Sequence, residues 1–124
     1  MSLENVFVAA GAAAAKTTDP IVVIDVGDLL SITDHFVITS GANVRQVRAI
    51  ADEVELRVKA GGGGSPRYVE GLDDARWVLL DYGEFVVHVF LGEARDYYDL
   101  ERLWADAPRV ELPRSRARRV AAET

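Results

Sequence analysis

The sequence predicts a single α/β domain with a mixed five-stranded sheet and helices packed on it. Apolar runs of strand length alternate with segments of helical periodicity, in the order helix, two strands, helix, three strands, helix. The helix between the second and third strands leaves enough chain for a parallel crossover. Only two helices are long, so we expect one face of the sheet to be partly open. The length of 124 residues, with 49% hydrophobic and 27% charged residues, is typical of one folded domain.

The first three predicted elements are a helix and two strands. Residues 5–16 are rich in alanine, which has the highest helix propensity, and predict a weakly amphipathic helix. Asp19-Pro20 ends this helical stretch, because proline disfavours helical geometry in the residue before it. Residues 21–25 form a continuous β-branched run that is typical of a buried strand. After a loop, residues 36–39 predict the second strand.

The clearest helix of the chain covers residues 44–59. Asn43 can cap its start, and Gln46, three residues later, can reach back in a capping-box arrangement. The buried stripe of this helix recurs at helical spacing and consists of Val44, Val47, Ala51, Val54 and Val58. Four glycines at residues 61–64 then stop the helix and form a link to the next element.

The second half of the domain contains three strands and a short helix. Residues 67–70 predict a short strand, and residues 77–81 and 85–90 predict a hairpin. The hairpin turns at Tyr82-Gly83, where glycine supplies the positive φ that tight hairpins require. Residues 96–105 predict the last helix.

Charge is distributed unevenly along the chain. Residues 1–107 carry 18 acidic and 9 basic side chains, whereas residues 108–124 carry 2 acidic and 5 basic ones. Each contact to a nucleic-acid phosphate needs a Lys or Arg, so an acidic body disfavours specific nucleic-acid binding. We therefore divide the chain into an N-terminal helix (residues 1–17), an α/β domain (18–107) and a basic tail. The composition of the tail predicts disorder and, at most, weak contact with RNA.

The absence of cysteine excludes disulfides and thiolate metal sites, and it favours a reducing compartment. The alanine run at residues 9–15 is too short to span a membrane and lacks the basic leader of a secretion signal. We therefore expect a cytoplasmic protein without a membrane anchor.

Aromatic and acidic side chains recur together near the ends of the apolar strands. Strand alternation puts Trp77, Leu79 and Asp81 on one face. An unpaired buried carboxylate is costly, so this mixture favours a protein interface over a sealed core. An alternative is left open, in which Trp77 is a core residue and Asp81 only caps the hairpin turn.

The last predicted helix adds further candidates for partner binding. Its spacing puts Tyr97, Leu100 and Trp104 on one stripe, which we expect to pack against the domain. Residues 70–106 hold 10 acidic and 3 basic side chains, a surplus that would attract a basic partner. Acids in the first turn also favour the helix dipole, which gives some of them a structural explanation. The predicted partner-binding residues are Trp77, Asp81, Tyr98, Asp99, Glu101 and Trp104. Of these, Trp104 has the strongest case for a core position instead.

The two histidines, His35 and His88, are weak candidates for chemistry. His88 alternates with valines inside a strand, which favours a core or sheet-face histidine over a catalytic one. His35 follows Asp34 at a strand start, where an acid–histidine pair could bind a metal or act as a base. No second histidine is near in sequence, so we predict no metal site.

A nucleotidyltransferase-like enzyme acting on a nucleotide with magnesium is the alternative function. Ser40-Gly41 before a helix faintly resembles the glycine–serine turn of those enzymes. They also need closely spaced paired aspartates to hold magnesium. Asp25 and Asp28 are three residues apart across a strand end, not one apart along a strand. We therefore predict no catalysis and no cofactor.

Three segments carry a resemblance to a known family: ITDHFVITSG at residues 32–41, WVLLDYGEFVVHVF at 77–90 and RDYYDLERLW at 95–104. Matching stretches flank them, with DPIVVIDV at 19–26, RQVRAIADEVE at 45–55 and the pair Glu70-Gly71. Together, over about residues 18–107, they resemble the ribosomal silencing factor family, also called RsfS or Iojap. The glycine link and the basic tail have no counterpart that we can match to the family.

The resemblance implies a mixed sheet related to nucleotidyltransferase folds but used for binding. It also implies a translational repressor that binds the large ribosomal subunit through the ribosomal protein numbered fourteen. By occupying that face, such a protein sterically blocks joining of the small subunit when nutrients are short, without a cofactor. The family likeness, together with the small size of the chain, also predicts a homodimer of the free protein.

Overall fold

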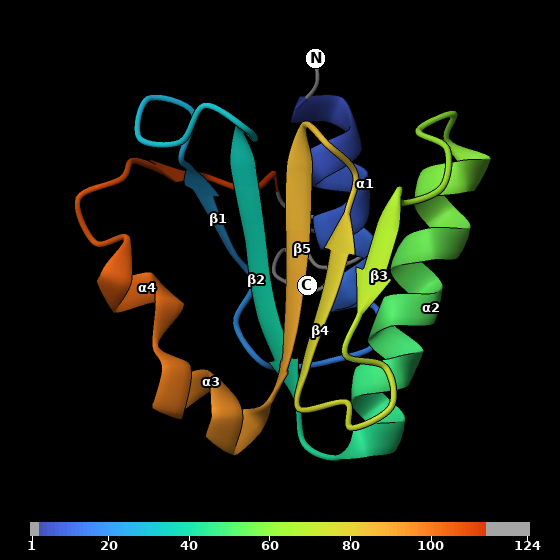
Figure 1. Ribbon diagram of the computed structural model, residues 1–124. Coiled ribbons are helices and arrows are strands. Elements are labelled where there is room, and N and C mark those ends of the chain that lie inside the picture. Colours follow the sequence, from blue (N-terminus) through green and yellow to red (C-terminus); the bar gives the residue numbers. More distant parts are fainter. Residues whose placement is uncertain (1–2, 114–124) are drawn as a thin grey trace, which may run out of the picture.

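The structure is a computed structural model that describes residues 3–113 (Figure 1). In chain order its elements are α1 (Leu3–Ala14), β1 (Val22–Asp25), β2 (His35–Gly41), α2 (Val44–Ala60), β3 (Tyr68–Glu70), β4 (Trp77–Asp81), β5 (Phe85–Leu91), α3 (Gly92–Tyr98), α4 (Leu100–Leu103) and β6 (Arg109–Val110). The strands form one sheet in the order β3-β4-β5-β2-β1-β6. No helix in this part of the chain has both the length and the apolar character needed to cross a membrane.

The centre of the sheet is a parallel pair, and every other pairing is antiparallel. β2 lies beside β5 with His35 opposite Phe85 and Gly41 opposite Leu91. β1 pairs antiparallel with β2, and β4 pairs antiparallel with β5. The chain reaches from β2 to β5 through α2, β3 and β4, as a parallel pair requires a long connection. The predicted mixed α/β sheet is therefore confirmed.

One face of the sheet is covered by α1 and α2, which lie side by side behind it in Figure 1. Most of the predicted stripe of α2 is fully buried, with Val47, Val54 and Val58 on the same core as Val87 and Val89 of β5. Val44 is only partly buried, and Ile50, which was not predicted, is fully buried. Three alanines of α1 (Ala9, Ala12 and Ala13) are also fully buried. Their small side chains allow α1 to approach its neighbours closely, which explains why an alanine-rich segment can serve as a core helix.

The second face is only partly covered. Ile24, Phe36, Ile38 and Phe90 form an apolar cluster there, against which residues of α4 and the chain after it pack. The short helices do not extend over β3, where Tyr68 is 61% exposed. The sheet therefore presents an incompletely covered face at its β3–β4 end.

The start of α2 is capped nearly as predicted. Oδ1 of Asn43 accepts a hydrogen bond from the Gln46 backbone N–H at 2.8 Å. Oε1 of Gln46 reaches one residue further back than in a capping box and accepts from the N–H of Ala42 at 2.6 Å. Nε2 of Gln46 also donates to the carbonyl of Lys16 at 2.9 Å. This side chain therefore joins the start of α2 to the segment that follows α1.

The prediction of five strands is wrong, because the sheet has a sixth strand, β6. It pairs antiparallel with β1, with Val110 opposite Val23, and the carbonyl of Pro108 accepts a hydrogen bond from the N–H of Asp25 at 2.8 Å. A strand of two residues is too short to show a hydrophobic period, so the sequence carries no signal for it. It lies in the segment 108–124 that the composition assigned to a tail, of which residues 114–124 are outside the described part of the chain.

Candidate protein-binding surface

Trp77 lies on the partly covered face and is the centre of an aromatic group. Its indole ring is partly exposed, with ring centroids 4.9 Å from Phe90 and 4.7 Å from Tyr98. Nε1 of Trp77 donates a hydrogen bond to Nδ1 of His88 at 3.0 Å. The ring is thus held from the sheet side by β5 and flanked by a residue of α3, while part of it faces solvent.

Gly71 explains how the chain enters β4 beside this ring. Its φ is +86°, and a Cβ at this position would overlap the carbonyl oxygen of Trp77. Only glycine fits both the left-handed backbone and the close approach. The pair Glu70-Gly71, part of the family resemblance, therefore has a structural role in placing Trp77.

The predicted single helix over residues 96–105 is wrong. The helical structure begins earlier, at Gly92, directly after β5, and it is interrupted at Asp99, whose φ is 50° and ψ is 53°. A left-handed residue breaks the helix into α3 and α4, and aspartate is among the few non-glycine residues that tolerate this conformation. Helical periodicity cannot reveal a break of one residue.

The break changes which side chains pack. Tyr97, predicted to pack, is 78% exposed, whereas Tyr98, predicted to bind a partner, is 44% exposed and contacts the ring of Trp77. Leu100 and Trp104 pack on the second-face cluster as predicted, with Trp104 in an edge-to-face contact to Phe36 at 5.7 Å. Trp104 therefore combines a core contact with partial exposure.

Glu101 is engaged in an ion pair inside the domain. Its Oε1 accepts from Nε of Arg95 at 2.9 Å, and the Arg95 side chain is only 11% exposed. Nη1 of Arg95 also donates to the Pro20 carbonyl at 2.8 Å and to Oγ of Ser40 at 3.0 Å. Oγ of Ser40 in turn donates to Asp19 at 2.7 Å. This network joins α3, α4, β2 and the chain before β1, so Glu101 and Ser40 both have structural roles.

Asp81 caps the hairpin turn at the other end of β4. Its Oδ1 accepts from the backbone N–H of Gly83 at 2.8 Å and lies 3.6 Å from Nε of Arg67. Asp81 lies four residue steps along β4 from Trp77, a distance of roughly 13 Å. Asp81 therefore caps the hairpin turn, which is the alternative that the sequence left open. It lies apart from the aromatic group around Trp77.

The six predicted residues thus fall into two places. Trp77 and Tyr98 are in contact, and Asp99, Glu101 and Trp104 follow Tyr98 along α4. Asp81 alone lies at the hairpin end of the sheet. The arrangement combines exposed aromatic rings and carboxylates without a reactive group between them, which suits the binding of a protein partner.

The family description "Ribosomal silencing factor during starvation" (RsfS) matches residues 1–124 of the chain. The chain belongs to the RsfS family. Its bacterial homologues carry the name ribosomal silencing factor.

The relatives of this RsfS chain include bacterial and mitochondrial proteins. It is 41% identical over 105 residues to "Ribosomal silencing factor RsfS" of Bacillus subtilis, covering 85% of this chain and 88% of that protein. It is 38% identical over 86 residues to "Mitochondrial assembly of ribosomal large subunit protein 1" of Mus musculus, covering 68% and 38%. A crystal structure of a Chromobacterium violaceum protein superposes with a TM-score of 0.80 at 32% identity, covering 94% of this chain and 93% of that one.

Two further residues of this RsfS domain, Tyr68 and Glu70, share the face of Trp77 and escaped the prediction. Tyr68 lies opposite Asp81 and Glu70 lies opposite Leu79 across the β3–β4 pair, so all four side chains point to one face. Tyr68 and Glu70 are exposed, and Leu79 is partly exposed. Their position follows from strand register, and a three-residue strand gives too little alternation to infer it from sequence.

His88 of the RsfS domain is a buried residue of the sheet, as predicted, and is 4% exposed. Burial lowers the pKa of its imidazole to about 4, so the ring is neutral at pH 7. His35 is partly exposed at the start of β2. Among residues 3–113, no three His, Asp or Glu side chains come together as a metal site.

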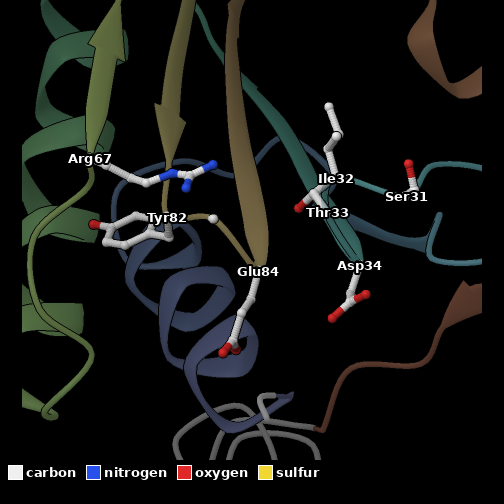
Figure 2. A pocket seen from close by; sticks show the side chains of 8 residues that line it. Ser31, Ile32, Thr33, Asp34, Arg67, Tyr82 and Glu84 are labelled. Atoms are coloured by element: carbon white, nitrogen blue, oxygen red, sulfur yellow. The ribbon is translucent and has the colours of Figure 1, made fainter.

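A shallow polar hollow of about 400 Å³ lies at the hairpin end of the sheet (Figure 2). Arg67 and Tyr82 stand on one side and Thr33 on the other, with Asp34 and Glu84 below them in this view. Burial, and then the charge of Glu55, raises the pKa of Tyr82 to about 12, so its hydroxyl keeps its proton at neutral pH. The hollow lies at the opposite end of β4 from Trp77.

Proposed function

We propose that this RsfS chain represses translation by binding the large ribosomal subunit through ribosomal protein number fourteen. By occupying the face that meets the small subunit, it sterically blocks subunit joining in starvation or stationary phase, in the cytoplasm. The family description supports silencing in starvation, and the name of the mouse relative points to the large subunit. The mechanism is competition for a surface, so it needs no turnover.

The observation that carries the proposal is an uncovered group of aromatic and acidic side chains, which we call the docking surface. It comprises Tyr68, Glu70, Trp77 and Tyr98, together with Asp96 and Tyr97, which are exposed on the same short helix α3 as Tyr98. Its three tyrosines (Tyr68, Tyr97 and Tyr98) are between 44% and 78% exposed, an unusual arrangement unless a partner covers them. From the predicted set, Trp77 and Tyr98 are its centre. Asp99, Glu101 and Trp104 lie next to it, in α4 and at the two ends of that helix. Asp81 lies at the hairpin end of β4, outside the docking surface.

The sign of the charge supports a basic partner. Residues 70–106, which include β4, β5, α3 and α4, hold 10 acidic and 3 basic side chains. Opposite charge on two partners raises the rate of encounter and excludes partners of like charge. A ribosomal protein, which must itself hold RNA, is a basic partner of the required kind.

The experiment that tests the proposal is co-sedimentation with separated ribosomal subunits. Purified protein should sediment with large subunits and reduce their association with small subunits in proportion to occupancy. Sedimentation with small subunits only, or with neither, would contradict the proposal. A parallel titration with isolated ribosomal protein number fourteen identifies the contact within the subunit.

Charge reversal on the docking surface is expected to weaken binding to the large subunit. Asp81→Lys and Asp99→Lys would also disturb the turn cap and the left-handed backbone. Glu70→Lys and Asp96→Lys are therefore cleaner, because both side chains are exposed and make no ion pair with any residue of the segment 3–113. We expect each to reduce affinity roughly three- to tenfold at low salt and less at high salt.

The matched control for charge reversal is Asp52→Lys, which makes the same change of charge on exposed α2, on the other side of the sheet. It should bind like the wild-type protein. Equal losses for all three variants would mean that net charge, rather than the docking surface, determines binding.

The proposed mechanism includes no catalysis. Asp25 is occupied locally, since its Oδ1 accepts from the N–H of Gly27 at 3.0 Å, and Ser40 belongs to the Arg95 network. A nucleotide with magnesium is therefore expected to leave the melting temperature unchanged, and a clear rise would favour the nucleotidyltransferase-like alternative.

Self-association of the free protein as a homodimer stays a prediction. The docking surface could be reused between two copies, which would make the dimer a stored form that cannot bind the ribosome. Light scattering at tens of micromolar protein measures the mass directly, and a monomer there would contradict it.

A further inference from the structure

Trp77, the central aromatic of the docking surface, is held from beneath by a buried histidine. We propose that His88 is a positioning residue for docking, which fixes the indole of Trp77 in the orientation that the ribosomal partner meets. The inference rests on the proposed function, because it assigns a role within the same surface. His88 itself is 4% exposed and cannot contact a partner directly.

The hydrogen bond defines the state of the imidazole. An indole N–H can only donate, so Nδ1 of His88, 3.0 Å away, must be the unprotonated nitrogen, and the ring proton lies on Nε2. Burial keeps the ring neutral at physiological pH, which preserves the acceptor. Position 88 therefore supplies one directional acceptor to Trp77.

Ring packing alone does not orient the indole. Trp77 contacts Phe90 at 4.9 Å and Tyr98 at 4.7 Å between ring centroids. These tilted contacts restrain the plane of the ring, but they do not act on the edge of the indole that carries the nitrogen. The bond to Nδ1 distinguishes the two edges, because only one of them has an N–H. Phe36, edge-to-face with His88 at 4.6 Å, holds the imidazole in turn.

The surroundings of the second ring nitrogen, Nε2, indicate that His88 does more than stabilise the fold. Nε2 is buried and has no hydrogen-bond partner within the described part of the chain. A buried N–H without a partner destabilises the folded state, and an apolar side chain of similar size would avoid that cost. The benefit of a histidine here must therefore come from Nδ1, and Nδ1 acts on Trp77.

A pair of near-isosteric substitutions separates the acceptor from the volume at position 88. In His88→Asn, Oδ1 takes the place of Nδ1 and can accept from the indole, whereas His88→Leu has the same size without an acceptor. Affinity is measured with Trp104 in place, and the indole measurements alone use a Trp104→Phe background, in which Trp77 is the only tryptophan. The readouts are the indole N–H resonance of Trp77, its hydrogen exchange in the free protein, and affinity for large ribosomal subunits.

We expect His88→Asn to keep slow indole exchange and near wild-type affinity. His88→Leu should shift the indole resonance, exchange fast and bind roughly tenfold more weakly. Equal indole behaviour and equal affinity of the two variants would overturn the inference. If His88→Leu does not fold, the wild-type protein still decides: a proton on Nδ1, or fast exchange of the Trp77 indole, overturns it.

The same measurements distinguish this inference from the proposed function. Protein with His88 intact that fails to sediment with large subunits contradicts the proposed function itself. If that protein binds, and His88→Leu binds as tightly as His88→Asn, only the positioning role of His88 is contradicted.

Discussion

Replacing Trp77 with alanine is expected to weaken binding to the large ribosomal subunit by roughly 30-fold or more, about 2 kcal/mol. The substitution removes the ring that joins Phe90 and Tyr98, so the centre of the docking surface loses its shape. It also leaves Nδ1 of His88 without its donor. Affinity is measured by co-sedimentation, with circular dichroism of the variant as the check that the sheet remains folded.

The control for Trp77→Ala is Leu56→Ala, which truncates an exposed apolar side chain on α2. Leu56 is 65% exposed and lies outside the docking surface, so its removal should leave affinity unchanged. Tyr98→Ala should follow Trp77→Ala with a smaller loss. If folded Trp77→Ala binds as tightly as the wild-type protein, the docking surface is wrongly assigned.

The second large effect is a pH dependence of stability that comes from His88. Its pKa is about 4 in the folded protein and near 6.5 when unfolded, so between these values the unfolded chain binds the extra proton. The folded protein therefore has its full stability, as far as His88 determines it, above pH 6.5. This contribution to the free energy of unfolding is lost as the pH falls toward 4. The expected loss in the free energy of unfolding between pH 7 and pH 4 is about 3 kcal/mol.

Urea unfolding of the wild-type protein and of His88→Leu at pH 7, 5.5 and 4 measures this effect. Carboxylates titrate alike in both proteins, so the difference between the two pH profiles isolates the histidine. The wild-type profile should fall more steeply with decreasing pH. Parallel profiles would show that the imidazole accepts a proton in the folded state without cost.

The elements that could be predicted from sequence are those whose boundaries and buried face are both encoded by neighbouring residues. The helix α2 has a cap at Asn43 and an uninterrupted apolar stripe, and the β4–β5 hairpin has Gly83, whose φ is +87°. In each case the residues that define the element also make its contacts. The elements without such a signal were wrong or absent: β6, which exists only because β1 offers it an edge, and the break at Asp99.

Several residues of the candidate site could be predicted from sequence, but their arrangement in space could not. Trp77 and Tyr98 were both expected to bind a partner, and the structure adds that they touch. Tyr97 was assigned to the wrong side, because the left-handed residue Asp99 lies between it and the packed Leu100 and Trp104, so the three do not share one helical stripe. Tyr68 joins the surface only through its register with β4, which depends on residues far along the chain.

The parallel pair at the centre of the sheet determines the order in which the chain can fold. Two local hairpins, β1–β2 and β4–β5, can each form from neighbouring residues, but joining them pairs His35 with Phe85, fifty positions along the chain. The entropy of closing that loop must be overcome before the central contacts stabilise the sheet. We therefore expect the rate-limiting step of folding to be the docking of two preformed hairpins, with α2 between them. Core substitutions in β2 or β5 should then slow folding, whereas those in β3 or β6 should mainly speed unfolding.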